Sequence, residues 1–257
     1  MGKLKSIRLI LLAIIVSCPL QNLLPQEKQN GGKRIVEILH SNLMLSQGDF
    51  RRLVGEVSLK HKEMYMTCDS AHYFEKTRVV KAYSNIHIQK GDTLHIYGEY
   101  LLYNSDNEMA ELEENVLLID RDTKLYTDHI YYDMANEVAK YNTGGRILNK
   151  ENTLTSISGI YYSETEIFNF KDSVKLVNPD YTMYSDTLVY DTKNETAYFF
   201  GPSEIFGDSL YAKCEEGWYD TKNKVSLLRK NALIDNEEQV ISGDSLFYDD
   251  EAGIPRT

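Results

Sequence analysis

The sequence is poor in proline, cysteine and tryptophan, and its positive charge is low relative to its negative charge. The 257 residues include 5 Pro, 3 Cys and 1 Trp, and 28 Lys and Arg stand against 39 Asp and Glu, which gives a formal net charge of −11. Proteins bind duplex nucleic acid by neutralising phosphates with Lys and Arg. The acidic balance therefore argues against a nucleic-acid partner. Tyrosine, with 19 copies, is abundant and favours strands that pack on one face.

A long hydrophobic run is present only near the N-terminus, at residues 9–16 (LILLAIIV), after the basic residues Lys3, Lys5 and Arg8. This run is shorter than the roughly 20 residues that span a bilayer, and the pattern is typical of a secretory signal. We therefore predict that residues 1–26 are a signal peptide, and removing its three positive charges changes the net charge from −11 to −14. Cleavage within residues 18–26 is the favoured outcome. The alternatives are lipidation of Cys18, which ends a lipobox-like Ile-Val-Ser-Cys, and an uncleaved anchor.

A repeat of about 29 residues fills the rest of the chain after a linker at residues 27–34. Its marker is a tyrosine, followed in several copies by a polar turn such as Asp-Thr-Lys-Asn at 191–194 and again at 220–223. The marker tyrosines are assigned as Tyr73, Tyr103, Tyr132, Tyr162, Tyr190, Tyr219 and Tyr248, with spacings of 30, 29, 30, 28, 29 and 29 residues. Fixed self-similarity of this kind is the signature of repeat architectures. We expect about seven copies within residues 35–257.

The hydrophobic period inside each copy is two, which indicates strands with one buried face. Apolar or small residues lie seven and five positions before the tyrosine, and another lies two positions before it. These offsets have opposite parity, so the apolar face switches at the acidic position between them. A one-residue phase slip implies a bulge or a sharp bend. We therefore predict bent strands that cross from one sheet into a second.

The return strands show matching breaks, such as Ser84-Asn85, Glu114-Asn115 and Gly144-Gly145. Each copy is thus predicted to be a hairpin of two bent strands, and stacked hairpins give two facing antiparallel sheets around an apolar interior. The fold class is all-β. Cys68 and Cys214 occupy the same repeat position five copies apart, which is too far for a disulfide, so both are predicted to be buried thiols.

No residue pattern indicates catalysis or a cofactor. The sequence has no nucleophile motif, phosphate-binding loop or dinucleotide fingerprint, and its six histidines show no metal-ligand spacing. The acidic position before each bend holds a carboxylate in most copies, which suits either Ca²⁺ ligation or capping of backbone N–H groups at the bend. Capping is favoured because the glycine-rich nonapeptide of calcium-binding β-rolls is absent. We predict a non-enzymatic protein without cofactor or metal.

Four stretches carry a resemblance to a known family: RIVEILHSNLM (34–44), LVGEVSLKHKEMYMTCDSAHYFEK (53–76), NIHIQKGDTLHIYGEYLLY (85–103) and ENVLLIDRDTKLYTDHIYY (114–132). They are similar to the OstA/LptA family of lipopolysaccharide-export proteins, in its long divergent branch, over roughly residues 34–250. The resemblance implies a V-shaped, open β-jellyroll that carries lipopolysaccharide acyl chains on an apolar inside. It also implies a periplasmic protein of the bridge to the outer membrane, which joins other bridge proteins or its own copies through edge strands.

The resemblance makes the repeat tyrosines and their apolar neighbours candidates for the groove that holds acyl chains, although the same residues also suit a dry core. The candidate lining residues are Leu101, Tyr103, Ile130, Tyr132, Ile160, Tyr162, Leu188, Tyr190, Val116, Leu118, Val174 and Leu176. The alternative function is a β-solenoid that binds polysaccharide or acts as a surface adhesin or scaffold. That alternative predicts outward-facing aromatic side chains and a closed, dry interior.

Overall fold

The computed structural model describes residues 35–249, which lie within one compact unit, Lys33–Thr257. The predicted signal peptide at 1–26, the linker at 27–34 and Cys18 lie outside the described residues. The described part contains strands and turns, without a helix long and apolar enough to cross a membrane. The fold class is therefore all-β, as the sequence predicted.

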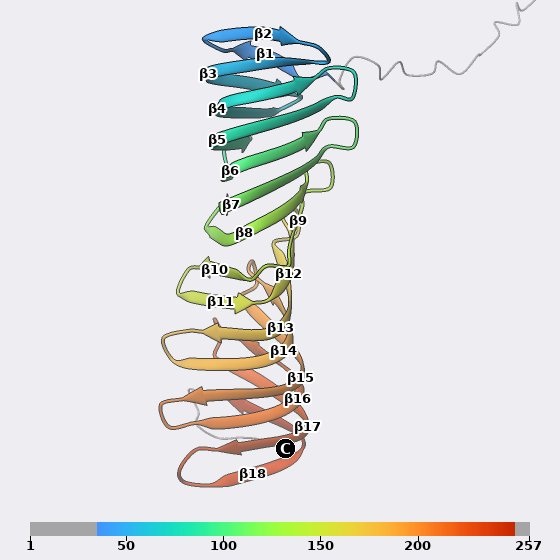
Figure 1. Ribbon diagram of the computed structural model, residues 1–257. Helices are drawn as coiled ribbons and strands as arrows, with labels where there is room; N and C mark the ends of the chain where they lie inside the picture. The colour runs from blue at the N-terminus through green and yellow to red at the C-terminus, as the bar shows by residue number, and fades with distance from the viewer. Residues whose placement is uncertain (1–34, 250–257) are drawn as a thin grey trace, which may run out of the picture. The chain divides into compact units, whose positions relative to one another are not determined.

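The strands follow one another in chain order through one antiparallel ladder (Figure 1). They are β1 (Glu37–His40), β2 (Leu43–Gln47), β3 (Phe50–His61), β4 (Met64–Phe74), β5 (Val79–Lys90), β6 (Leu94–Asn104), β7 (Met109–Asp120), β8 (Thr123–Asp133), β9 (Val138–Tyr141), β10 (Gly145–Asn149), β11 (Asn152–Ser156), β12 (Ser158–Tyr162), β13 (Ile167–Val177), β14 (Tyr181–Asp191), β15 (Thr196–Gly207), β16 (Tyr211–Asp220), β17 (Val225–Asp235) and β18 (Val240–Asp249). Each long strand pairs with the long or divided strand that follows it, so the strand contacts lie within hairpins and between neighbouring hairpins, as expected for a repeat protein.

Three of the bent strands are divided in two at the bend. Both β1 and β2 pair with β3, both β9 and β10 pair with β8, and both β11 and β12 pair with β13. The divided strands also pair with each other, β10 with β11 and β9 with β12. The ladder is therefore continuous from β2 to β18, and the divisions mark the place where every strand turns.

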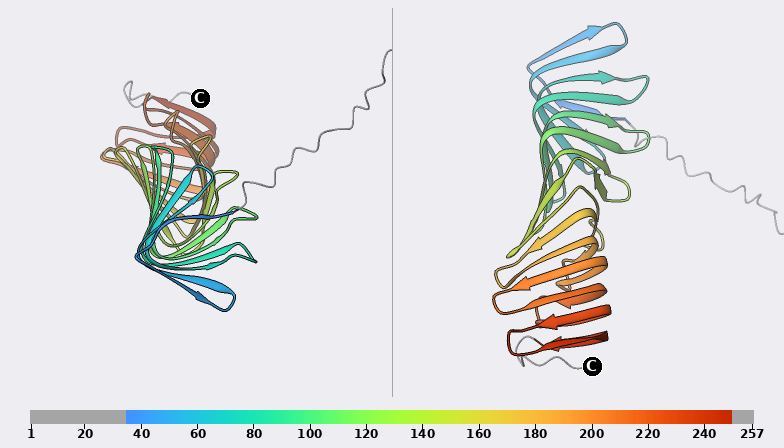
Figure 2. Two further views of the ribbon diagram at one scale, coloured as in Figure 1. Left: turned by 90° about the horizontal axis from the view of Figure 1, so that it is seen from above. Right: turned by 60° about the horizontal axis from the view of Figure 1, so that its bottom comes forward.

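The bend lies where the sequence predicted it. In β4 the buried side chains are at 64, 66 and 68 and then at 71 and 73, and the β4–β5 register shifts between Thr67 and Ser70. The same change of parity recurs in the outgoing strands β6, β8 and β14, whereas the return strands β7, β13 and β17 keep the parity of their buried positions and carry one extra residue at the bend. Each strand thus contributes one arm to each of two facing layers (Figure 2).

The return strands turn through two consecutive residues in the left-handed region. The φ angles are 62° and 51° at Ser84 and Asn85, and 65° and 54° at Glu114 and Asn115. Asp172–Ser173 and Lys230–Asn231 repeat this conformation. Left-handed backbone costs a non-glycine residue about 1–2 kcal/mol, so the bends persist because pairing and packing on both arms stabilise them.

Substitution at one bend tests this strain. Ser173 has a φ of 55° and is exposed, so Ser173→Val is expected to lower the free energy of unfolding by about 1–3 kcal/mol, because a β-branched residue is disfavoured there. Ser173→Gly is expected to be neutral or stabilising. Thr182→Val, in the regular part of β14, is the control and should change it by less than about 0.5 kcal/mol. Urea denaturation measures the free energy of unfolding of the three variants. If Ser173→Val and Thr182→Val lower it equally, the bend is not strained.

Candidate ligand-binding interior

The two arms of the bent strands enclose an apolar interior. The repeat tyrosine and the residue two positions before it point inward from one arm, and alternate residues of the return strands point inward from the other. Ten of the predicted lining residues have exposures of 2% or less: Leu101, Tyr103, Val116, Leu118, Ile130, Tyr132, Val174, Leu176, Leu188 and Tyr190. The sequence therefore placed these ten on the correct face. At this burial they form a packed core, so a ligand reaches them only if the arms separate.

The prediction was wrong for the fourth copy of the repeat, where Ile160 and Tyr162 lie on the outer face. Tyr162 is 36% exposed, whereas Tyr161 is 1% exposed and Gly159 is buried. The true marker is Tyr161, 29 residues after Tyr132 and 29 before Tyr190. A glycine is required at 159 because a Cβ there would lie 2.5 Å from the hydroxyl of Tyr141, whose ring fills the space.

A cavity of about 240 Å³ opens in the interior near the C-terminal end of the described strands. None of the predicted lining residues borders it. Its wall combines inward positions of later copies, such as Tyr219 and Ile234, with residues of the turn between β15 and β16. The residues of the wall are Asp180, Tyr181, Met183, Ile205, Gly207, Asp208, Ser209, Leu210, Ala212, Tyr219, Ser226, Leu228, Ile234 and Tyr248. The wall is therefore mostly apolar, with two aspartates among the residues that border it.

The cavity has a cause in the sequence. Seven positions before the marker tyrosine the copies carry Met66, Ile96, Leu125, Leu154 and Met183, but the next copy carries Ala212. The missing side-chain volume at Ala212 leaves space between the arms. This small residue is the signal that sequence reasoning overlooked, because the repeat positions were treated as equivalent.

Three of the buried repeat tyrosines hydrogen-bond across the interior to the turn of an earlier hairpin. The Tyr103 hydroxyl lies 2.6 Å from His61 Nδ1, Tyr161 donates to Asp120 Oδ2 at 2.9 Å, and Tyr190 accepts from Asn152 Nδ2 at 2.8 Å. Burial raises the pKa of Tyr190 to about 12. These bonds tie the end of one arm to the end of the other and satisfy hydroxyl groups that would be costly to leave unpaired.

Ion pairs continue this closure on the side opposite the bends. Lys62 pairs with Glu108, Lys90 with Glu137 at 2.6 Å, Arg121 with Glu166 at 3.8 Å and Lys150 with Glu195 at 2.5 Å. The four glutamates are 29 residues apart, and the next pair, Lys224 with Asp180 at 3.0 Å, has the opposite polarity. We name these five contacts the mouth ion pairs. Partly exposed pairs contribute about 0–1 kcal/mol each, so the mouth is closed by weak contacts.

The acidic positions at the bends cap neighbouring groups. Glu99 accepts from the backbone N–H of Asn85 at 3.2 Å, while Asp69 accepts from the Asn85 side chain at 2.8 Å and Glu215 from the Asn231 side chain at 2.6 Å. Cys68 and Cys214 are free and buried, as predicted. Burial raises the pKa of the Cys68 thiol to about 12 and that of Cys214 to about 11, so both are poor nucleophiles.

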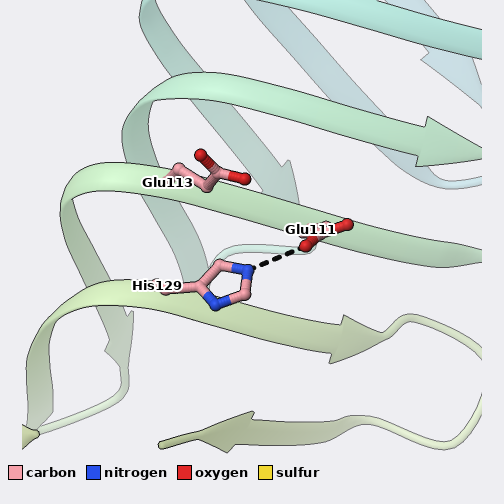
Figure 3. Close-up of side chains that lie close together, drawn as sticks. All are labelled: Glu111, Glu113 and His129. Carbon is pink, nitrogen blue, oxygen red and sulfur yellow. Dashed lines mark hydrogen bonds and ion pairs between the residues drawn. The ribbon is translucent and has the colours of Figure 1, made fainter. Parts of the chain in front are cut away.

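One cluster on the outer face was not anticipated. Strand pairing brings His129 of β8 beside Glu111 and Glu113 of β7, and His129 Nε2 lies 2.9 Å from Glu111 Oε1 (Figure 3). The three residues are separated by up to 18 positions in the sequence, and the exact strand register is needed to bring them together. Sequence spacing alone found no metal-ligand pattern among the histidines for this reason.

The cross-arm hydrogen bonds can be tested on one strand. Tyr190→Phe removes the acceptor of buried Asn152 and is expected to lower the free energy of unfolding by about 1–3 kcal/mol. Tyr184→Phe, also on β14 but on the outer face and 43% exposed, should change it by less than about 0.5 kcal/mol. Chemical denaturation with both variants makes the comparison. Equal values would show that the hydroxyl of Tyr190 does not hold the arms together.

Comparisons with known proteins found a solved structure with some similarity to this chain and a matching family model. The crystal structure of LptH, titled as the LptA homologous periplasmic component of the conserved lipopolysaccharide transport device from Pseudomonas aeruginosa, is similar to this chain with 15% identity and a TM-score of 0.39. The match covers 42% of this chain and 81% of LptH. A search of curated proteins found no match. A family model for OstA-like protein matches residues 33–186, more than half of the 257 residues. The chain belongs to the OstA-like protein family.

Proposed function

We propose that this protein binds lipopolysaccharide in the periplasm and forms part of the bridge that carries it to the outer membrane. The observation that carries the proposal is the cavity of about 240 Å³ between the two arms, bordered by Met183, Leu228 and Ile234. Membership of the OstA-like family supports it. The role is that of a carrier and includes no catalytic step.

The cavity suits part of an alkyl chain better than a whole lipid. Its volume is below the roughly 300–1,000 Å³ of pockets that enclose a drug-sized ligand. An acyl chain gains about 0.8 kcal/mol for each CH₂ group that it buries, and the apolar wall supplies that burial. The aspartates Asp180 and Asp208 border the same space, so a phosphorylated headgroup would stay outside it or approach through a bridging divalent cation.

Passage beyond the cavity requires the arms to separate at the mouth. The interior from β3 to β13 is packed, with residues such as Leu101 and Phe170 fully buried. The bends are covalent and cannot part, whereas the mouth is held by partly exposed ion pairs and tyrosine hydrogen bonds. An acyl chain that advances along the interior would therefore displace contacts at the mouth and replace side-chain packing with its own.

The edges of the ladder supply the proposed contacts with bridge partners or further copies of this chain. Among the described residues, β2 pairs only with β3 and β18 only with β17. The edge strand β2 also exposes Leu43, Met44 and Leu45, each at 40% or more. A flat apolar edge with unpaired backbone groups invites strand addition.

A second candidate function is polysaccharide binding on the outer face. Tyr184, Tyr198 and Phe200 are exposed by more than 40%, and Tyr198 is the register partner of the outward-facing Trp218. Exposed aromatic side chains and a largely packed interior are the features that favour polysaccharide binding over lipid binding. Binding would then depend on the sugar and leave the cavity unused.

Lipopolysaccharide titration of the protein and two variants separates these functions. Ala212→Phe places a large side chain in the cavity and is expected to weaken binding at least tenfold, because the space for an alkyl chain is lost. Lys213→Phe introduces the same side chain on the outer face of β16 and should bind like the parent. Circular dichroism checks that both variants fold.

The same titration includes lipid-free polysaccharide as competitor. The proposal predicts no competition, because the acyl chains carry the affinity. Full competition, with both variants binding as the parent does, would support the polysaccharide function and contradict the carrier. No binding by the parent protein would contradict both.

The edge contact predicts self-association or capture of a partner that depends on β2. The double variant Met44→Lys, Leu45→Lys is expected to weaken this association at least tenfold, because charged residues on an edge strand oppose strand pairing. Thr67→Lys is the control, because Thr67 is exposed on β4, which is paired on both sides. Sedimentation at increasing protein concentration measures the association, and an unchanged profile in the double variant would refute the role of this edge.

A further inference from the structure

The outer face of β7 and β8 carries three potential metal ligands that converge. Glu111 and Glu113 are two positions apart on β7 and so point to the same face, and Glu113 is the register partner of His129 on β8. One ligand atom from each residue lies within 4.8 Å of the others (Figure 3). The His129 and Glu111 side chains are 20% and 27% exposed, so the cluster is partly shielded and still open to an ion.

Further carboxylates lie beside this cluster. Glu114 and Asp128 border the same surface hollow as Glu113 and His129. Within residues 35–249, no Lys or Arg forms an ion pair with any of the four carboxylates, and His129 is their one basic neighbour among the ion pairs. Carboxylates held close together without a counter-charge repel one another. This repulsion favours the binding of a cation from solution.

The repeat supplies an internal comparison. Glu216 occupies the position of His129 in a later copy, three residues before its tyrosine, and Arg229 occupies the position of Glu113. There the carboxylate is neutralised within the protein, by Arg229 at 3.6 Å and Lys230 at 2.7 Å. Equivalent backbone positions thus hold an ion pair in one copy and a group of donors without Lys or Arg in the other. The cluster is therefore not a consequence of the fold.

The donor set and its neighbours select the class of ion. One imidazole nitrogen with carboxylate oxygens suits zinc and related transition metals, whereas calcium and magnesium prefer oxygen ligands alone. The ring of Tyr131 lies edge-on to His129 with 4.5 Å between centroids. Such outer contacts orient metal ligands.

We propose that Glu111, Glu113 and His129 bind one divalent transition-metal ion of the zinc type on the outer face of β7 and β8. Zinc ligands lie about 2.0–2.2 Å from the ion, so small rotations of the two glutamate side chains bring their oxygens into reach. Three protein ligands leave a coordination position for water. The site lies outside the apolar interior and does not depend on the proposed carrier function.

Zinc titration of protein without a histidine tag, first stripped of metal by a chelator, tests the site. Isothermal titration calorimetry is expected to show one zinc ion per chain. His129→Ala and Glu113→Gln should each weaken binding at least tenfold. His95→Ala is the matched control, since it removes one histidine from another outward-facing position on β6, beside His87, and should bind like the parent.

Melting temperatures make the result independent of heats of dilution. Saturating zinc is expected to raise the melting temperature of the parent and of His95→Ala, because a ligand that binds only the folded state stabilises it, and to leave that of His129→Ala unchanged. The metal-free variants should melt close to the parent. The proposal is overturned if the parent protein binds no stoichiometric zinc, or if His129→Ala or Glu113→Gln binds zinc as the parent does. It is also overturned if His95→Ala loses as much zinc affinity as His129→Ala. Displacement of zinc by equimolar calcium would also overturn it, because a carboxylate-only site would then be responsible.

Discussion

The bend in each strand is the constraint on which the rest of the structure depends. Return strands turn through two consecutive left-handed residues, such as Glu114 and Asn115, and at the same bend the buried positions of outgoing strands such as β6 slip by one residue, from 94, 96 and 98 to 101 and 103. Without that slip, the side chains inside the first arm would point outward in the second, because the side-chain period of a strand is two. The slip keeps apolar residues inside on both arms, so each hairpin closes half of the interior and stacked hairpins make it continuous.

The same constraint explains why so much of the fold could be predicted from the sequence. Strict alternation within Leu94–Asn104, with a change of parity at Gly98–Glu99, indicates a bent strand without further information. The breaks at Ser84-Asn85 and Glu114-Asn115 stand out in the sequence by their polar character and coincide with left-handed pairs. Local chemistry and global fold agree in these copies, as expected for a sequence that specifies one structure.

The prediction failed where two adjacent residues satisfy the same pattern. Tyr161 and Tyr162 both fit the marker, and Ile160 is a better match to the apolar position than Gly159. The structure decides otherwise because Tyr141 enters the interior beside Gly145 and Gly159, where a Cβ would lie about 2.5 Å from its ring or hydroxyl. A side chain from a neighbouring strand set the register here, and a reading of single strands has no access to that contact. The His129 cluster was missed for the same reason, since its members meet only through pairing of β7 with β8.

The two sides of the interior differ in strength, and this difference bears on function. The bend side is covalent chain, reinforced by caps such as Asn231 to Glu215. The mouth side is closed by partly exposed ion pairs and by tyrosine hydrogen bonds, each of which contributes on the order of 1 kcal/mol. Motion between the arms is therefore less costly at the mouth. The cavity borders the mouth pair of reversed polarity, Asp180 with Lys224. The cavity and this weakly held edge of the interior thus share Asp180, so under the proposed function an apolar chain that enters from the mouth would meet free volume at this point.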